Sequence, residues 1–197
     1  MRLLPRAFFQ RGAEVVARDL LGSPIRSRIG GVPVEGIIVE TEAYLGFDDP
    51  ASHGYRGRLH SGNVNLYAPP GTWYVYRSYG IHWCANLVCG GPLRGSAVLL
   101  RGIRPMRGLE VMRERRGGMV DELLANGPGK LCQALGITRE LDGLAMPASL
   151  VRVYRRTDRP AGVEVTPRIG ITKAVDWPLR FVLSGAARPA GLSRAPL

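Results

Sequence analysis

IIVETEAYLG, residues 37–46, begins as an apolar run and ends in two glutamates and a tyrosine. It continues a β-prone segment that starts at residue 34, and Gly30-Gly31 separates this segment from an earlier β-prone run. A glycine pair between two such runs is a hairpin signal. We therefore predict a strand over residues 34–44, with residues 37–39 anchoring it in the core and its polar end held at a site.

The polar end of this predicted strand offers two carboxylates. Side chains alternate along a strand, so Glu40, Glu42 and Tyr44 share one face and the residues between them share the other. A carboxylate shielded by apolar neighbours resists ionisation and becomes a better general base for activating water. The alternative is that both glutamates form ion pairs with arginines. When these two residues are considered alone, this alternative is favoured. A third hypothesis is a carbohydrate glycosidase with Glu40 and Glu42 as acid and base.

The composition points to a polyanionic partner. The 197 residues hold 27 lysines plus arginines against 16 acidic residues, which gives a net charge of +11 and a pI near 10.4. Such a balance most often indicates nucleic acid, although membrane headgroups remain possible. All the basic residues except Lys130 and Lys173 are arginines, whose planar guanidinium suits phosphate. A GC-rich genome would also favour arginine codons.

Cysteine and histidine usage argues against a metal or disulfide framework. Cys84, Cys89 and Cys132 are odd in number and contain no C-x-x-C pair. The three histidines are scattered, so we expect no metal site and no cofactor. No run reaches about 18 uncharged apolar residues. A soluble protein of the reducing cytoplasm, without an export signal, is expected.

Periodicity and turn residues predict the remaining elements. No repeat or linker divides the chain, so we predict one α+β domain over residues 1–197. Its sheet is expected to be curved and mainly antiparallel, with surrounding helices and a protruding β-hairpin. The expected elements are helices at 12–21, 108–116 and 126–136, strands at 72–78, 82–89 and 96–105, closing strands within 149–156 and 163–171, a long functional loop at 45–72, and a loose tail at 186–197.

Aromatic residues cluster around one predicted turn. Tyr74 and Tyr76 lie on one face of a strand, and Tyr79 lies at the turn beside Gly80. A ring at a hairpin tip can enter a stack of bases, and base-to-aromatic stacking stabilises by about 1–3 kcal/mol. Packing in the core is the alternative for all three tyrosines, and we prefer it for Tyr74.

Three further polar residues have two interpretations each. Asn86 lies among apolar strand residues, so its amide is either a structural hydrogen bonder or a reader of a ligand edge. Arg101, in the run VLLRG, is either a buried ion-pair partner or a site residue. His53 is the first histidine of the long loop that follows the acidic strand.

Several stretches together resemble the alkyladenine (3-methyladenine) DNA glycosylase family. They occur in the family's order over about residues 13–185, so the resemblance covers nearly the whole chain. The stretches are VETEAYLG, DDPASH, PPGTWYVYRSYGIHWCANLVC, AVLLRGIRP, NGPGKLCQAL and PLRFVLSG.

The resemblance implies a DNA repair enzyme that flips an alkylated or deaminated purine out of duplex DNA and hydrolyses its N-glycosidic bond. Carried across by motif, Glu42 would activate the attacking water, and Arg101 would lie beside that water and the backbone phosphate. Lys130 and Lys173 do not fall at the family's site positions, so the resemblance implies a monofunctional enzyme without a Schiff base. We expect a monomer that acts on double-stranded DNA and not at a membrane.

The same resemblance assigns the substrate pocket. Tyr44, His53 and Tyr76 would form its walls and edge contacts, and Asn86 would lie at its floor and disfavour the exocyclic amine of guanine. Tyr79 would fill the gap left in the duplex. The competing class is a non-catalytic, basic nucleic-acid-binding domain, for which charge and aromatic residues suffice.

One loop departs from the family pattern. Where relatives commonly have Thr-Pro-Arg-Asn, this chain has residues 60–63, His-Ser-Gly-Asn. An arginine that could contact phosphate is therefore missing. Arg56, Arg58 and Arg77 are candidates to compensate for it.

Overall fold

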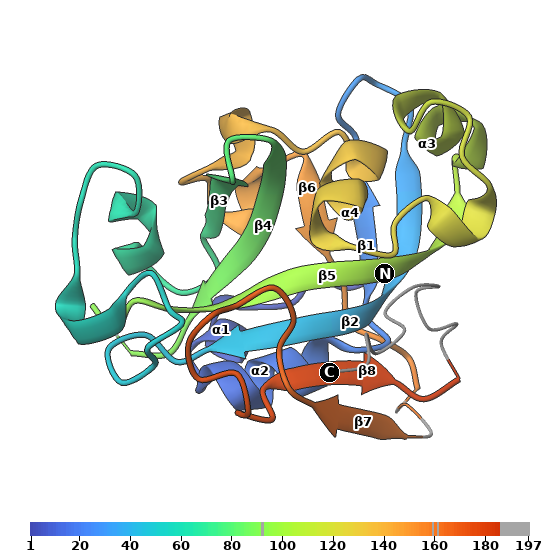
Figure 1. Cartoon of the computed structure of the whole chain (residues 1–197). Coiled ribbons are helices and arrows are strands. Elements are labelled where there is room, and N and C mark those ends of the chain that lie inside the picture. Colours follow the sequence, from blue (N-terminus) through green and yellow to red (C-terminus); the bar gives the residue numbers. More distant parts are fainter. Residues whose placement is uncertain (92, 159, 161, 186–197) are drawn as a thin grey trace.

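Strand β2, Val34–Tyr44, lies at the centre of the fold, with its predicted bounds. In the computed structural model it pairs with β1, β5 and β8, all antiparallel (Figure 1). The structure describes residues 1–91, 93–158, 160 and 162–185. The predicted tail at 186–197 lies outside these residues.

The sheet is antiparallel and built around this strand. Its path runs β3-β4-β5-β2-β1-β6, while β8 pairs with both β2 and β7. The single α+β domain with an antiparallel sheet is confirmed. The strands are β1 Pro24–Ser27, β2 Val34–Tyr44, β3 Trp73–Ser78, β4 His82–Cys89, β5 Ser96–Arg107, β6 Val151–Val153, β7 Val163–Thr166 and β8 Arg180–Leu183.

Four helices pack around the sheet among the described residues. They are α1 Arg6–Phe9, α2 Ala13–Leu20, α3 Leu109–Arg115 and α4 Pro128–Leu135. Helix α2 packs on β2 and β5, and α4 packs on β4 and β5. Both contribute to one large core in which Val16, Leu20, Leu131 and Leu135 are fully buried. No described helix is long and apolar enough to span a membrane.

The predicted helices and strands are found within a few residues of their expected bounds, but two elements were missed. Helix α1 has only four residues and begins directly after Pro5. Strand β8 also has four residues, and it is held by β2 on one side and by β7 on the other. Elements this short carry almost no periodicity of their own. For β8, pairing partners distant in sequence decide the conformation.

The polar end of β2 is irregular. The pairing of β2 with β5 shifts register around Glu40, which marks a β-bulge. Beyond it, Glu40, Thr41, Glu42 and Ala43 are all buried, so both faces of the strand are covered there. Thr41 donates from its hydroxyl to the carbonyl of Ala17 in α2, 2.9 Å away. The core anchor upstream is weaker than expected, since of residues 37–39 only Ile38 is fully buried.

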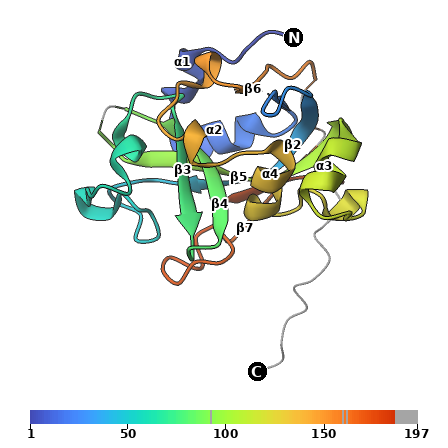
Figure 2. The same cartoon turned by 90° about the horizontal axis from the view of Figure 1, so that it is seen from above.

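Strands β3 and β4 form the predicted hairpin, which projects from the body of the molecule (Figure 2). At its tip, the N–H of Ile81 donates to the carbonyl of Ser78 at 3.0 Å, and Tyr79 and Gly80 both have positive φ, 50° and 68°. These are the signs of φ that a type I′ turn requires. Glycine adopts this conformation freely, whereas tyrosine does so only under strain.

The loop between β2 and β3 contains two short 3₁₀ turns, Tyr55–Gly57 and Val64–Tyr67. The fully buried side chain of Asn63 organises it: its amide donates to the carbonyls of His53 and Arg58, and its oxygen accepts the N–H of His60. The departing sequence at 60–63 therefore keeps a residue that shapes the loop.

Candidate active site

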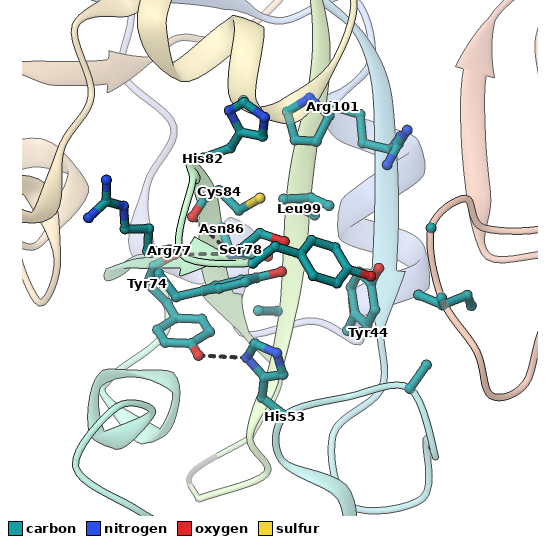
Figure 3. A pocket seen from close by; sticks show the side chains of 18 of the residues that line it. Tyr44, His53, Tyr74, Arg77, Ser78, His82, Cys84, Asn86, Leu99 and Arg101 are labelled. Atoms are coloured by element: carbon teal, nitrogen blue, oxygen red, sulfur yellow. Dashed lines mark hydrogen bonds between the residues drawn. The ribbon is translucent and has the colours of Figure 1, made fainter.

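A cavity of about 1010 Å³ opens where the end of β2, the β3–β4 hairpin, the 45–72 loop, the start of α4 and the 169–173 segment meet. Its volume lies at the upper end of the range of about 300–1,000 Å³ that is usual for ligand pockets. Six of the seven predicted site residues line it. They are Tyr44, His53, Tyr76, Tyr79, Asn86 and Arg101, and Figure 3 labels four of these among the lining side chains.

Aromatic rings form one wall. The rings of Tyr74 and Tyr76 are stacked with centroids 5.5 Å apart, and the His53 ring meets Tyr76 edge-on at 4.5 Å. Tyr74 is buried in a small apolar cluster, as preferred from the sequence, but it also lines the cavity. Its hydroxyl lies 2.7 Å from Nδ1 of His53, the dashed contact in Figure 3. Tyr74 thus orients the histidine ring as well as packing in the core.

The surroundings of His53 disfavour the charged form of its ring. Desolvation of its ring, followed by the nearby charges of His60 and Arg58, lowers the pKa of His53 below the usual 6.5. A neutral imidazole has one N–H and one acceptor nitrogen. When Nδ1 accepts from the Tyr74 hydroxyl, the proton lies on Nε2, which can then donate to a ligand.

Glu42, the seventh predicted residue, lies directly behind the cavity wall and is fully buried. Its Oε1 accepts the N–H of Ile169 at 2.8 Å and lies 3.4 Å from Arg101 Nη1, while its Oε2 accepts the Tyr44 hydroxyl at 2.9 Å. These three partners all line the cavity. Burial raises the pKa of the Glu42 carboxyl, against the opposing effects of Arg101 and the two hydrogen bonds.

Glu40 has a different environment. Its Oε1 accepts from Arg101 Nε at 2.9 Å and from Arg180 Nε at 2.6 Å. Burial would lower the pKa of Arg101, but Glu42 and Glu40 outweigh it and raise that pKa, so the guanidinium stays charged. Glu40 is thus an ion-pair partner of two arginines, whereas Arg101 is both an ion-pair partner and a cavity residue.

The amide of Asn86 is a structural hydrogen bonder, which is one of the two interpretations considered for it from the sequence. Its Nδ2 donates to the carbonyl of Tyr74 at 3.0 Å and lies 3.5 Å from that of Cys84, so the amide is anchored to the hairpin. Its Oδ1 has no hydrogen-bond partner among the described residues. Because Asn86 lines the cavity, this oxygen is the end that a ligand can meet.

Tyr79 lies at the hairpin tip and is 84% exposed, far from any core. Core packing, the alternative considered from the sequence, is wrong for this residue.

The cavity is strongly cationic. Besides Arg101, it is lined by Arg58, Arg77, Arg116, Lys130 and Lys173. Among the described residues lining it there is no aspartate or glutamate. Of the three arginines considered as compensation for the altered loop, Arg58 and Arg77 reach the cavity, while the Arg56 guanidinium lies over the Tyr55 ring at 5.2 Å. Both lysines line the cavity, although neither matches a family site position.

Several groups at this site were not predicted from the sequence as site residues. They are the backbone N–H of Ile169 and the side chains of Tyr74, Cys84 and Arg180. A backbone N–H is present at almost every residue, so no sequence signal marks it. Arg180 falls within PLRFVLSG, one of the motifs of the resemblance, and this was the one available clue.

Removal of a base from nucleic acid needs a surface on which the base can stack, cations for the phosphates and a carboxylate that can take a proton from water. The described residues bring these together at one cavity, which fits the class of base-removing glycosylases. Comparison with known proteins gives the family. The sequence model of the family described as methylpurine-DNA glycosylase (MPG) matches residues 7–187.

Individual relatives agree. Each of the following carries the name "Putative 3-methyladenine DNA glycosylase". A protein of Agrobacterium fabrum (strain C58) is 50% identical over 186 residues, which cover 93% of this chain and 90% of the relative. A protein of Nitrobacter winogradskyi is 48% identical, with 93% and 85% covered, and one of Methanoculleus marisnigri is 46% identical, with 93% and 96% covered. The chain belongs to the methylpurine-DNA glycosylase family, and the resemblance seen in the sequence is confirmed.

Proposed function

We propose that the protein hydrolyses the N-glycosidic bond of an alkylated or deaminated purine flipped out of duplex DNA, with Glu42 as the general base. The observation that carries this proposal is the buried carboxylate held by Ile169, Tyr44 and Arg101 directly behind the aromatic cavity. The family and the names of the relatives support a methylated purine such as 3-methyladenine as substrate.

In the proposed reaction the purine stacks against Tyr76, and Tyr79 fills the gap in the duplex. An alkylated purine carries positive charge, and an aromatic face attracts a cation by about 0.5–2 kcal/mol. Water attacks C1′ of the sugar while Glu42 takes its proton, and the bonding electrons leave with the base. Because Glu42 is fully buried in the free protein, the water must reach it between the cavity residues that contact it, Tyr44, Arg101 and Ile169.

The remaining residues serve recognition in this proposal. The Asn86 oxygen would meet and disfavour the exocyclic amine of normal guanine, and Arg101 would contact the attacking water and a backbone phosphate. We further propose a monofunctional, monomeric enzyme. Trapping with borohydride tests the first point, since an imine formed by Lys130 or Lys173 would become a stable crosslink to DNA. Light scattering tests the second.

The decisive experiment uses duplexes that each carry one lesion, such as 7-methylguanine, hypoxanthine or ethenoadenine, followed by alkali to cut at abasic sites. We expect cleavage with the wild type, and Glu42→Gln should bind the lesion duplex but lose base release by at least about 100-fold. Glu35→Gln is the matched control, because Glu35 lies on the same strand and pairs with Arg26 and Arg107, which do not line the cavity. Appreciable release by Glu42→Gln would remove Glu42 from this role.

Absence of cleavage on every duplex would instead support the competing class, a non-catalytic binding domain. The carbohydrate glycosidase hypothesis has less support, because it needs Glu40 as a second catalytic carboxyl, and Glu40 is not among the described residues that line the cavity. Glu40 is also occupied by two arginines.

A further inference from the structure

Behind the end of β2 lies an ion pair that the proposed chemistry does not use. Arg168 Nη1 and Nη2 donate to Asp49 Oδ2 and Oδ1 at 2.5 and 2.8 Å, and both side chains are completely buried. Two parallel bonds of this kind fix the plane of the guanidinium as well as its position.

Arg168 also contacts the strand that carries the proposed base. Its Nη1 donates to the carbonyl of Ala43 at 3.0 Å, and its guanidinium carbon lies 4.6 Å from the centroid of the Tyr44 ring. The next residue, Ile169, gives its N–H to Glu42. One arginine therefore connects directly to Tyr44 and, through its neighbour in the chain, to Glu42.

Asp49 ties the same point to the long loop. Besides the two bonds from Arg168, its carboxylate accepts the N–H groups of Leu45 at 3.1 Å and Ala51 at 3.0 Å. It thus fixes the beginning of the loop that leads to His53, four residues further along. The Asp49–Arg168 pair thus connects both to the loop that forms part of the cavity wall and to the segment that holds the Glu42 carboxylate.

Stability alone is a poor reason for such a pair. Taking two charges out of water costs several kcal/mol per ion, and well-packed apolar residues of similar volume often serve stability as well or better. A planar, bidentate pair does fix the orientation of both side chains. When a reaction depends on the placement of one carboxylate, its rate can fall about 100-fold if that carboxylate is misplaced by about 1 Å.

We propose that Asp49 and Arg168 form a positioning pair, which holds Glu42 through Ile169 and Tyr44 through contact with its ring, without either residue touching the substrate. This inference rests on the proposed function, because it assumes that the geometry of Glu42 limits base release.

The pair should also influence the titration of Glu42. The Ile169 N–H lowers the pKa of the Glu42 carboxyl, so a displaced Ile169 would let that pKa rise further. The other titratable and charged groups that act on Glu42 are Arg101 on β5, Tyr44 and Glu40 on β2, Tyr76 on β3 and Cys84 on β4. None of them is altered in the variants below.

The test compares Arg168→Met, Asp49→Asn and Arg168→Lys with the wild type in single-turnover base release across pH. Arg156→Met is the matched control: Arg156 also donates to two backbone carbonyls, those of Asp19 and Leu21 at the end of α2, and pairs with the Asp19 carboxylate, but it does not line the cavity. Asp49→Asn keeps one acceptor oxygen for the loop. Circular dichroism and thermal unfolding report whether each variant is folded at the assay temperature.

We expect Arg168→Met and Asp49→Asn to slow base release on the order of 10- to 100-fold. Their affinity for the lesion duplex should stay within about threefold of the wild type. The acidic limb of their pH–rate profile should lie at higher pH than in the wild type. Arg168→Lys should recover part of the rate, and Arg156→Met should match the wild type in rate and profile. Wild-type rate and pH profile in folded Arg168→Met and Asp49→Asn would overturn the inference, as would an equal loss in Arg156→Met. An inactive wild type would instead defeat the proposed function itself.

Discussion

Glu40 and Glu42 show what sequence periodicity resolves at the scale of single residues and what it does not. Their spacing predicts a common face, and both indeed lie within ion-pair distance of Arg101. The resemblance, and not the periodicity, assigns the role of base to Glu42. The different contacts of the two residues agree with this assignment, and they span more than a hundred residues: Arg180 with Glu40, and the Ile169 N–H with Glu42. No local pattern contains such contacts.

The raised pKa of Glu42 predicts a pH-dependent rate. The proposed base must be ionised, so base release should fall as the pH falls through a midpoint above 4.5, the ordinary value for the group. Single-turnover rates between pH 4 and 9 measure this midpoint. A midpoint at or below 4.5 would contradict the role of a desolvated Glu42.

The same shift predicts a pH-dependent stability. A carboxyl with a raised pKa favours the folded state while it is protonated, and this contribution is lost as the pH rises from 4.5 through the folded pKa. It amounts to about 1.4 kcal/mol for each pH unit between the two pKa values. Residue 42 cannot titrate in Glu42→Gln, so this variant does not lose that stability as the pH rises. Its free energy of unfolding minus that of the wild type should therefore increase from pH 4 to pH 8. Denaturant melts at both pH values test this.

The bond between Tyr74 and His53 predicts a smaller effect. Tyr74→Phe keeps the stacked ring and removes the hydroxyl that orients His53. Loss of one neutral hydrogen bond should slow base release about 3- to 10-fold, and nitrogen NMR of the His53 ring should show a changed tautomer population. Tyr67→Phe is the control, because the Tyr67 hydroxyl donates to the Arg58 carbonyl and not to the histidine. An unchanged His53 spectrum in Tyr74→Phe would contradict the assigned contact.

At the scale of elements, the sequence predicts those that carry their own pattern and misses those that depend on partners. Strand β2 was placed correctly because eleven residues and a glycine pair mark it. The segment Arg180–Leu183 has only four residues, and it becomes a strand because β2 and β7 flank it. The bulge at Glu40 is likewise invisible in the sequence, since it depends on the register with β5.

The β3–β4 hairpin predicts a conflict between stability and binding. Tyr79 occupies a left-handed position at φ 50°, which costs a non-glycine residue of its type about 1–2 kcal/mol, whereas asparagine tolerates it. Tyr79→Asn should therefore raise the free energy of unfolding by about 1 kcal/mol while weakening lesion binding by about 1–3 kcal/mol. Denaturant melts and lesion-duplex titrations measure the two effects.

Two further variants test the stacking role at the same tip. Tyr79→Trp should retain lesion binding because it keeps an aromatic ring. Ile81→Ala, at a neighbouring side chain that is 65% exposed, should weaken binding less than Tyr79→Asn. Equal losses from both tip positions would show that the hairpin needs general apolar contact and not stacking.

At the scale of the whole molecule, the arginine excess has two uses. The composition predicts a surface for a polyanion, and the cationic cavity agrees with it. Several arginines have structural bonds as well, since they donate to backbone carbonyls of the fold. These are Arg11, Arg115, Arg152, Arg156 and Arg168, together with Arg116, which lines the cavity as well. Total charge therefore overstates what DNA can contact.

This division of the arginines predicts a moderate salt dependence. About five cationic side chains line the cavity besides Arg101, so the slope of log K against log salt for a lesion duplex should be about −4 to −5. A slope near −10 would mean that the whole net charge contributes. The glycosylase should also bind the lesion duplex more tightly than the undamaged duplex, whereas a simple basic binding domain would bind both alike.

The order of the chain has a consequence for synthesis. Arg180, which completes the environment of Glu40, is separated from it by 140 residues, and Ile169 follows Glu42 by 127. On the ribosome, the proposed catalytic carboxylate emerges well before these partners are made. A nascent chain that ends before β8 should therefore hold no working site.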